Sequence, residues 1–181
     1  MGYRQVEELA NFGKRTEKEI HIIECGTDQD KLGHKYMSMW YKDEPFRGKC
    51  YGHNVGMRHV MLFDKDKKND YYLFMHNDIF FNKDNKFDPL DKMVEIMEKN
   101  KKIGVLSPTE KNSPYPDGKP RTDSWHKVST CDYLCLMIKR STLEEVGFLN
   151  PDFKYCWGAI HELSYKLYKR NLCVAYCDVV S

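Results

Sequence analysis

The sequence has almost no excess of charge of either sign. Its 29 lysines and arginines face 27 aspartates and glutamates, which leaves a formal net charge of +2 over 181 residues. Proteins that bind nucleic acid without sequence preference carry a marked basic excess, so a nucleic-acid partner is not expected. Hydrophobic residues make up 41% and charged residues 31% of the chain, as in ordinary soluble domains.

Long hydrophobic runs are also missing. The sequence contains no stretch that is apolar and long enough to cross a membrane, and no secretory signal. We therefore expect a cytoplasmic protein and leave open an association with the periphery of a membrane. The chain has no internal repeat or low-complexity segment, and its length suits one domain, so we expect a single domain over 1–181.

The cysteines lack the CxxC spacing of redox and zinc motifs, and their number is odd. They are Cys25, Cys50, Cys131, Cys135, Cys156, Cys173 and Cys177. Several lie in apolar runs, where a free cysteine packs as a small hydrophobic residue. We expect reduced core thiols rather than a disulfide or zinc framework.

Strand-like and helix-like patterns alternate along the chain. They predict helices over 3–19, 54–63, 89–100, 141–146 and 159–170. They predict strands over 20–24, 71–78, 103–106, 132–139 and 172–180. This alternation is typical of an α/β fold with a mixed, mostly parallel central sheet and helices on both faces. The stretch 107–127 is rich in Pro, Gly and Asp and is predicted to be a long loop of the kind that covers binding sites.

Two helix starts carry clear local signals. Asp88 is a suitable N-cap, Pro89 suits the first helical position, and Asp91 favours the positive end of the helix dipole. Ser141 and Glu144 have the spacing of a capping box.

One apolar strand runs directly into a carboxylate. The sequence Tyr-Tyr-Leu-Phe-Met over 71–75 is followed by His76, Asn77 and Asp78, and then by apolar residues again. A buried carboxylate without a partner is costly, so we expect Asp78 to lie at the open end of the sheet. Open α/β sheets bind their ligands at that place, which makes Asp78 a candidate ligand contact.

Three further segments accompany this strand in a meaningful order. They are Glu24-Cys25-Gly26-Thr27-Asp28, Gly52-His53-Asn54-Val55-Gly56-Met57-Arg58, and the pair Val146–Phe153 with Trp157–Leu163. Together the four features make the chain resemble the family 2 glycosyltransferases of the GT-A fold, a Rossmann-like architecture. In that family an acidic turn after a strand binds the nucleoside, an NxG helix start follows, a DxD strand comes next, and an acidic helix closes the series.

The resemblance implies an activity and its cofactors. It implies transfer of a sugar from a UDP-, GDP- or dTDP-sugar to a hydroxyl group of a glycan, lipid-linked or protein acceptor, with inversion at the anomeric carbon. A divalent cation, Mn²⁺ or Mg²⁺, would stabilise the departing diphosphate. Asp78 would be its ligand. His76 stands in the first acidic position of DxD, and as a softer ligand it would favour Mn²⁺.

The resemblance also implies site residues. The donor would be contacted by Glu24, Asp28, Asn54, Arg58, Asn77 and Asp78. The substrates would be contacted by Trp157 through stacking, and by Trp125 and His126 in the long loop. Each also has a purely structural interpretation, such as a strand-end carboxylate for Asp78, a satisfied polar residue for His76, a turn carboxylate for Glu24, a helix cap for Asn54 and a salt bridge for Arg58.

Two departures from the family pattern bear on activity. An inverting transferase needs a general base, and the usual aspartate position is Ile160 here. Glu162 falls on the second acidic position and is the preferred base, with His161 and Asp152 as alternatives.

The second departure concerns the family's first, central strand, which is not found before the first helix. Its absence would leave an unpaired sheet edge beside the donor site. Amino-terminal truncation, a natural short form, or replacement by the run 172–180 would each account for it. The alternative function is therefore a non-catalytic binding or assembly module on the same fold. A nucleotidyltransferase suits the sequence less, because no glycine-rich basic loop occurs near its start.

Overall fold

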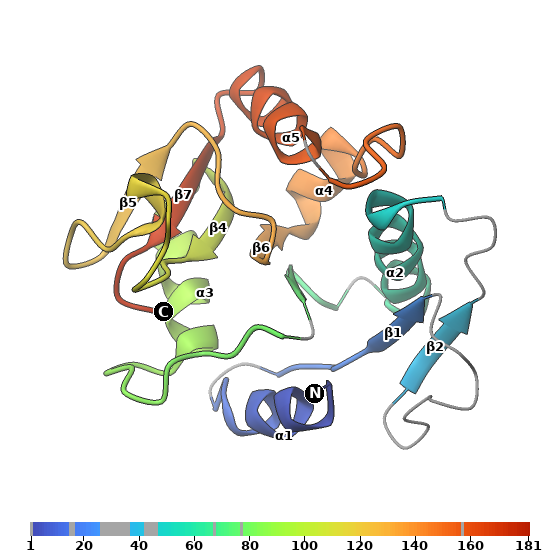
Figure 1. Cartoon of the computed structure of the whole chain (residues 1–181), viewed down its shortest axis with the longest axis horizontal. Coiled ribbons are helices and arrows are strands. Elements are labelled where there is room, and N and C mark those ends of the chain that lie inside the picture. Colours follow the sequence, from blue (N-terminus) through green and yellow to red (C-terminus); the bar gives the residue numbers. More distant parts are fainter. Residues whose placement is uncertain are drawn as a thin grey trace.

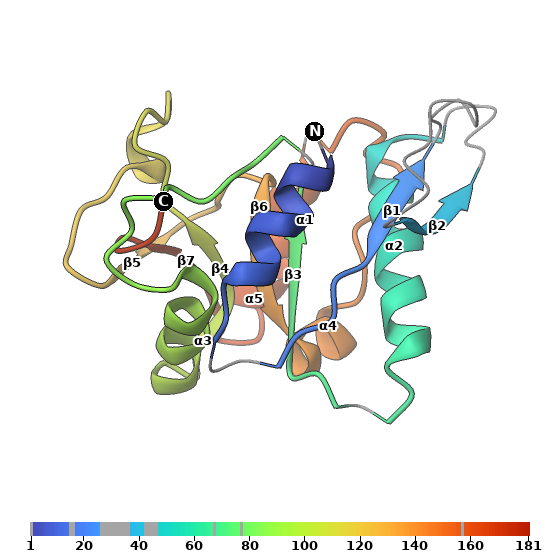
Figure 2. The same ribbon diagram turned by 90° about the horizontal axis from the view of Figure 1, so that it is seen from below.

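The computed structural model describes residues 2–14, 17–25, 37–41, 47–66, 68–76, 78–156 and 158–181. The helices are α1 (Gly2–Asn11), α2 (Lys49–Phe63), α3 (Pro89–Lys99), η2 (Pro116–Gly118, a 3₁₀ turn), α4 (Arg140–Val146) and α5 (Ala159–Tyr168). The strands are β1 (Ile22–Cys25), β2 (Met37–Tyr41), β3 (Tyr71–Met75), β4 (Ile103–Pro108), β5 (Trp125–Val128), β6 (Cys135–Lys139) and β7 (Cys173–Cys177). Figures 1 and 2 show their arrangement.

Five strands form the main sheet, in the order β3-β6-β4-β7-β5. The prediction of an α/β fold with a mixed sheet is confirmed. The expected majority of parallel pairs is not observed, because β4 and β7 are parallel while the other three ladders are antiparallel. The reason lies in the connections: β4, β5 and β6 follow one another without an intervening α-helix, and parallel neighbours usually need such a crossover.

Helices cover both faces of this sheet, as predicted (Figure 1). On β6, Leu136 and Ile138 face a core shared with α2, α4 and α5. Their neighbours Cys135 and Met137 face the opposite core, which contains the side chains of α3 and part of α1. The pleat of the strand causes this division, because successive side chains point to opposite faces.

The strands β1 and β2 form a separate parallel pair beside α2 (Figure 2). Gly56 allows α2 to approach β1 closely, since a Cβ at Gly56 would lie 3.3 Å from Ile23 Cγ1. In the described part of the chain, β3 has a ladder partner on one side only. The other edge of β3 is therefore unpaired among the described strands. The run 172–180, which the sequence analysis considered as a replacement for the missing strand, contributes β7 to the interior of the sheet, between β4 and β5.

The observed helix boundaries test the helix starts and ends that the sequence predicts. Asp88 caps α3 as predicted and accepts hydrogen bonds from the backbone N–H groups of Leu90 and Asp91. α1 ends at Asn11 rather than at residue 19, because Gly13 has a φ of 69° and donates its N–H to the Asp88 carboxylate. The predicted capping box at Ser141 is wrong, since α4 begins at Arg140 without a side-chain cap.

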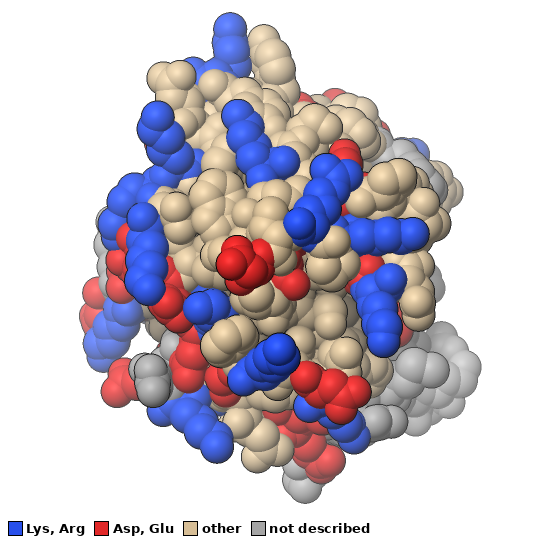
Figure 3. Space-filling view, turned by 90° about the vertical axis from the view of Figure 1, so that its left-hand side faces the viewer, with Lys and Arg blue, Asp and Glu red and all other residues tan. Residues whose placement is uncertain are grey.

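Further features of the described part of the chain are its surface charge, the length and polarity of its helices, and its free thiols. On the face shown in Figure 3, basic and acidic side chains are interspersed. None of the helices in the described ranges is long and apolar enough to cross a membrane. Six cysteines, all except Cys25, are described as free thiols, and five of these six are buried.

Candidate functional site

A pocket of about 390 Å³ lies beyond the ends of β3 and β4. Asp78 lines it from the turn that follows β3, and its side chain is exposed. The prediction that Asp78 lies past the open end of its strand is therefore confirmed. Glu110 and Lys111, from the segment after β4, line the same pocket. The first part of the predicted 107–127 loop thus borders the pocket, while its last residues belong to β5.

The turn that carries Asp78 is held by a side chain from α1. Gln5 is buried, and its Nε2 donates to the carbonyl oxygens of His76 and Ile79 at 2.6 Å each. Phe12, also on this segment, packs edge-on against Phe81 at 5.7 Å between ring centroids. The sequence analysis missed Gln5. Its signal is a polar residue on the same helical face as apolar Leu9.

A second carboxylate, Asp132, lines the pocket from the residue range before β6. Its backbone N–H donates to the Tyr176 hydroxyl oxygen at 2.9 Å, and that hydroxyl lies 3.4 Å from Asp132 Oδ2. Asp132 was also missed as a site residue. The available signal was an acid directly before an apolar strand, the mirror image of Asp78 directly after one.

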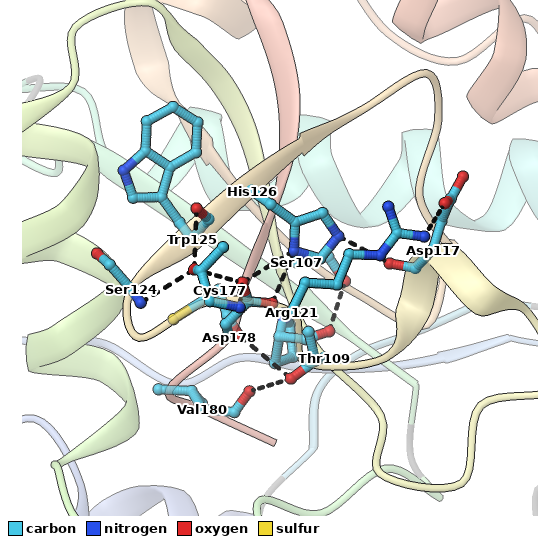
Figure 4. A network of polar contacts seen from close by, with 12 residues as sticks. Ser107, Thr109, Asp117, Arg121, Ser124, Trp125, His126, Cys177, Asp178 and Val180 are labelled. Atoms are coloured by element: carbon cyan, nitrogen blue, oxygen red, sulfur yellow. Dashed lines mark hydrogen bonds and ion pairs between the residues drawn. The ribbon is translucent and has the colours of Figure 1, made fainter.

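The floor of the pocket is fixed by Thr109. This side chain is buried, and its backbone N–H and hydroxyl both donate to the carbonyl oxygens of Cys177 and Val180, at 3.1–3.3 Å. These bonds attach the end of β4 to the segment after β7 (Figure 4). At this side the pocket is therefore lined by a segment after β4 that is hydrogen-bonded to the backbone at the end of β7 and just after it.

His126, an expected substrate contact, has partners within the fold at both ring nitrogens. Its Nδ1 lies 2.7 Å from an oxygen of Asp178, whose side chain is fully buried, and its Nε2 lies 3.0 Å from the Asp117 carbonyl oxygen. Thr122 donates both its N–H and its hydroxyl to the same Asp178 carboxylate. Trp125 points away from this network (Figure 4). Neither Trp125 nor His126 lines the pocket.

His76 lies in an interior aromatic cluster. The His53 ring is 5.3 Å from the His76 ring and 4.6 Å from the Tyr133 ring, measured between centroids. Burial, helped by the nearby His76 and Lys49, lowers the pKa of His53 to about 4. Burial also lowers the pKa of His76, against the opposing effect of Asp78. Within the described residues, His76 Nε2 and the Tyr133 hydroxyl are buried without a hydrogen-bond partner.

Asn54 and Arg58 of the NxG helix have partners within the fold. The Asn54 side chain is buried and pairs with the Leu149 backbone, donating to its carbonyl at 2.7 Å and accepting from its N–H at 3.1 Å. Since α2 begins at Lys49, Asn54 lies inside the helix and does not cap it. The Arg58 guanidinium lies over the Phe148 ring at 5.2 Å. Neither residue lines the pocket.

The three candidate bases lie on or just before α5. Glu162 Oε1 is 3.2 Å from Lys166 Nζ, and in the described part of the chain its Oε2 is buried without a hydrogen-bond partner. His161 and Asp152 are exposed. None of the three lines the pocket that contains Asp78. Ile160, in the place of the family's acid, is buried in the core.

Four expected contacts are not placed by the structure. Asp28, Asn77 and Trp157 lie outside the described residues, and of Glu24 only the backbone, in β1, is described.

The pocket contains suitable donors for a hard cation. Asp78, Asp132 and Glu110, which all carry carboxylates, are among its lining residues. No group of three or more His, Cys, Asp or Glu side chains within the described ranges is close enough to hold a metal by itself. Magnesium-type sites commonly use only one or two carboxylates and complete their coordination with substrate phosphates and water. These residues therefore fit a cation that arrives with a phosphorylated ligand.

Comparison with known proteins shows the fold and leaves the family open. No family model and no curated protein matches the sequence. Among solved structures, a crystal structure of GalNAc-T7 with UDP, GalNAc and Mn²⁺ matches 99% of this chain, with a TM-score of 0.73 and 13% sequence identity. The chain spans 40% of the length of that protein. The chain therefore has a glycosyltransferase-like fold, and the resemblance to family 2 in particular stays a prediction.

Proposed function

We propose that this chain is a glycosyltransferase domain that binds a nucleotide-diphospho-sugar in the pocket beyond β3 and β4. The observation that carries the proposal is the place of Asp78, which lines a pocket of about 390 Å³ at the strand ends of a glycosyltransferase-like fold. A pocket of this volume suits a small organic ligand, and α/β sheets bind such ligands at strand ends. The sugar would pass to a hydroxyl group of a glycan, lipid-linked or protein acceptor.

Asp78 is the proposed protein ligand of a divalent cation, with Asp132 as a second carboxylate across the pocket. When bound, the cation would neutralise charge on the departing diphosphate. His76 is left out of the ligand set because its Nε2 is buried in the aromatic cluster. The remaining oxygen donors suit Mg²⁺ as well as Mn²⁺, and the similar GalNAc-T7 structure contains Mn²⁺. Glu24 and Asp28 stay proposed contacts of the nucleoside.

Glu162 is the proposed general base of an inverting transfer. Its Oε2, which has no hydrogen-bond partner among the described residues, supports this role, since a buried carboxylate oxygen is able to accept a proton from an acceptor hydroxyl brought against it. Its Oε1 is engaged by Lys166, which orients the carboxylate. Substrate would have to bridge from the pocket to α5, because Glu162 itself does not line the pocket.

Calorimetric titration with UDP- and GDP-sugars, in the presence and absence of Mn²⁺, tests the donor site. We expect metal-dependent binding that Asp78→Ala abolishes. Asp66→Ala is the matched control, because Asp66 is an exposed acid beside the opposite end of β3, and it should bind as wild type does. If no nucleotide sugar binds to the wild-type chain, the proposal fails.

One observation favours a second candidate, a non-catalytic module that keeps the donor pocket. Ile160 replaces the family's acid and is buried in the core, where it cannot accept a proton. This candidate predicts donor binding without turnover. Measuring the rate of donor hydrolysis for wild type and Glu162→Gln separates the two: hydrolysis that falls at least tenfold in the variant supports the enzyme with Glu162 as base, and the absence of hydrolysis by wild type supports the module. A measurable rate that the variant leaves unchanged rejects Glu162 as the base.

A further inference from the structure

Two thiols from distant parts of the chain lie in contact. Cys50 is in the first turn of α2 and Cys156 is just before α5, 106 residues later. Their Sγ atoms are 3.2 Å apart. Cys50 is fully buried, whereas Cys156 is partly exposed. Only one of the two thiols is therefore reachable by a reagent in solvent.

The backbone holds these two segments together. The Lys49 N–H donates to the Lys154 carbonyl oxygen, and Gly48 fits here only because it lacks a side chain, since a Cβ would lie 2.4 Å from that same oxygen. Cys156 has a φ of 64°, a left-handed conformation that residues with a side chain rarely adopt. The approach of the thiols thus follows from fixed backbone contacts on both sides of the pair, not from two flexible side chains.

We infer that Cys50 and Cys156 are a site of reversible oxidation, at which a low-molecular-weight disulfide converts the two thiols into an intramolecular disulfide. The sulfur atoms need to close from 3.2 Å to about 2.05 Å. The Cys156 thiolate attacks one sulfur of the small disulfide, which releases one small thiolate and leaves a mixed disulfide on Cys156. The Cys50 thiolate then attacks the Cys156 sulfur and releases the second small thiolate. The two cysteine protons end on the two released thiols, so atoms and electrons balance.

The surroundings make this reaction slow at neutral pH. Burial and the contact with Cys50 raise the pKa of Cys156 to about 12, and Lys49 opposes this rise only in part. The reactive thiolate is therefore scarce at neutral pH. As long as the pH stays below the pKa, the thiolate fraction rises about tenfold for each unit by which the pH is increased. We expect the oxidation rate to rise about tenfold per unit between pH 7 and pH 9.

The pair lies near Tyr133, a residue whose two neighbours in sequence line the pocket. Burial, with the nearby Cys156 and Cys50 as further causes, raises the pKa of Tyr133, so the three groups are neighbours. Tyr133 stands between Asp132 and Leu134, which both line the pocket. Oxidation would consequently join α2 to the segment before α5 next to the proposed donor site. The inference itself does not depend on what the pocket binds.

Peptide mapping after incubation of the full chain with oxidised glutathione at pH 8.5 tests the inference. Trypsin places each thiol in its own fragment, 50–58 for Cys50 and 155–166 for Cys156, so a linked pair is unambiguous. We expect these two fragments joined, 2 Da lighter than their sum, and separated again by dithiothreitol. Cys131→Ala, which removes another buried thiol, should retain the link. Cys50→Ala and Cys156→Ala should each lose it.

Thermal unfolding gives a second readout. A cross-link that closes a loop of this length should raise the melting temperature of oxidised wild type on the order of 10 °C, and this gain should be absent in Cys50→Ala. If the alanine variants do not fold, the mapping of wild type decides alone. Unlinked 50–58 and 155–166 fragments after prolonged oxidation, or a link between other cysteines, would overturn the inference.

Discussion

Two buried polar groups, each containing histidine, lie at opposite edges of the main sheet. At β5, His126 has a carboxylate or carbonyl oxygen at both ring nitrogens, and Asp178 receives further donors from Thr122. Beside β3, the rings of His53, His76 and Tyr133 contact one another in tilted and edge-on arrangements, and two of their polar atoms have no partner among the described residues. The sequence predicts one histidine from each group as a site residue, His76 as a metal ligand and His126 as a substrate contact.

The two groups differ in how many of their polar atoms have hydrogen-bond partners among the described residues. A buried polar group with every hydrogen bond made stabilises one arrangement and has no capacity left for a ligand. An unsatisfied buried group costs free energy and is found where another requirement outweighs stability. The β3 group lies next to the turn that carries Asp78, which is the region where we propose that the donor binds. Completeness of hydrogen bonding, not residue type, distinguishes the two histidine clusters.

The largest expected effect is the loss of Asp178. Asp178→Ala removes a fully buried carboxylate and leaves His126 and Thr122 donors without an acceptor. A hydrogen bond to a charged group contributes about 1.5–3 kcal/mol, and this carboxylate interacts with the Thr122 N–H, the Thr122 hydroxyl and His126 Nδ1, so the free energy of unfolding should fall by more than about 3 kcal/mol. Urea unfolding measures it. Asp123→Ala is the matched control, because Asp123 is an exposed acid that directly follows Thr122 in the sequence. It should change the free energy of unfolding by less than about 0.5 kcal/mol.

The second effect is acid sensitivity in the β3 group. His53 has a pKa of about 4 in the folded chain and an ordinary value of 6.5 when unfolded, so the unfolded state binds more protons between these values. Stability should therefore fall as the pH drops through this window, by about 2 kcal/mol at pH 5. Unfolding free energies measured from pH 7 to pH 5 test this. His53→Phe, which cannot titrate, should show a flatter profile; identical profiles would contradict the assignment.

A third prediction compares neighbours on α2. Asn54 follows His53 in sequence, but its amide is fully engaged with the Leu149 backbone. Asn54→Ala should lower the free energy of unfolding by about 1–3 kcal/mol, because it leaves a buried N–H and a buried carbonyl unpaired. Chemical denaturation provides the value. Asn11→Ala removes an exposed amide and should have almost no effect on the free energy of unfolding. Equal losses for the two variants would show that the buried contacts of Asn54 with Leu149 contribute nothing extra.

The smallest effect on stability is expected at Asp78. Its side chain is exposed, so Asp78→Ala should change the free energy of unfolding by less than about 0.5 kcal/mol. The same variant should lose metal-dependent donor binding. A melting curve recorded beside the calorimetric titration separates the two properties. A clear loss of stability in Asp78→Ala would mean that Asp78 stabilises the fold, and the loss of binding would then not identify it as a ligand contact.

Part of the site was accessible from the sequence because its signal is local. Asp78 directly follows an apolar strand, and hydrophobic periodicity with one polar residue is enough to put that carboxylate past a strand end. Asp132 and Gln5 escaped the same reasoning. Their importance depends on Tyr176 and on the 76–79 turn, which are distant in sequence and adjacent only in space.

By itself, the sequence determined the alternation of strands and helices, the start of α3 at Asp88 and the position of Asp78. These properties follow from backbone propensity and from the burial of apolar residues along one segment at a time. Only the tertiary structure decided the antiparallel ladders, the retention of His126 by Asp178, the enclosure of His76 and the contact of Cys50 with Cys156. Each of these joins residues far apart in the chain, and a contact between distant segments is specified by how they pack, which no single segment encodes.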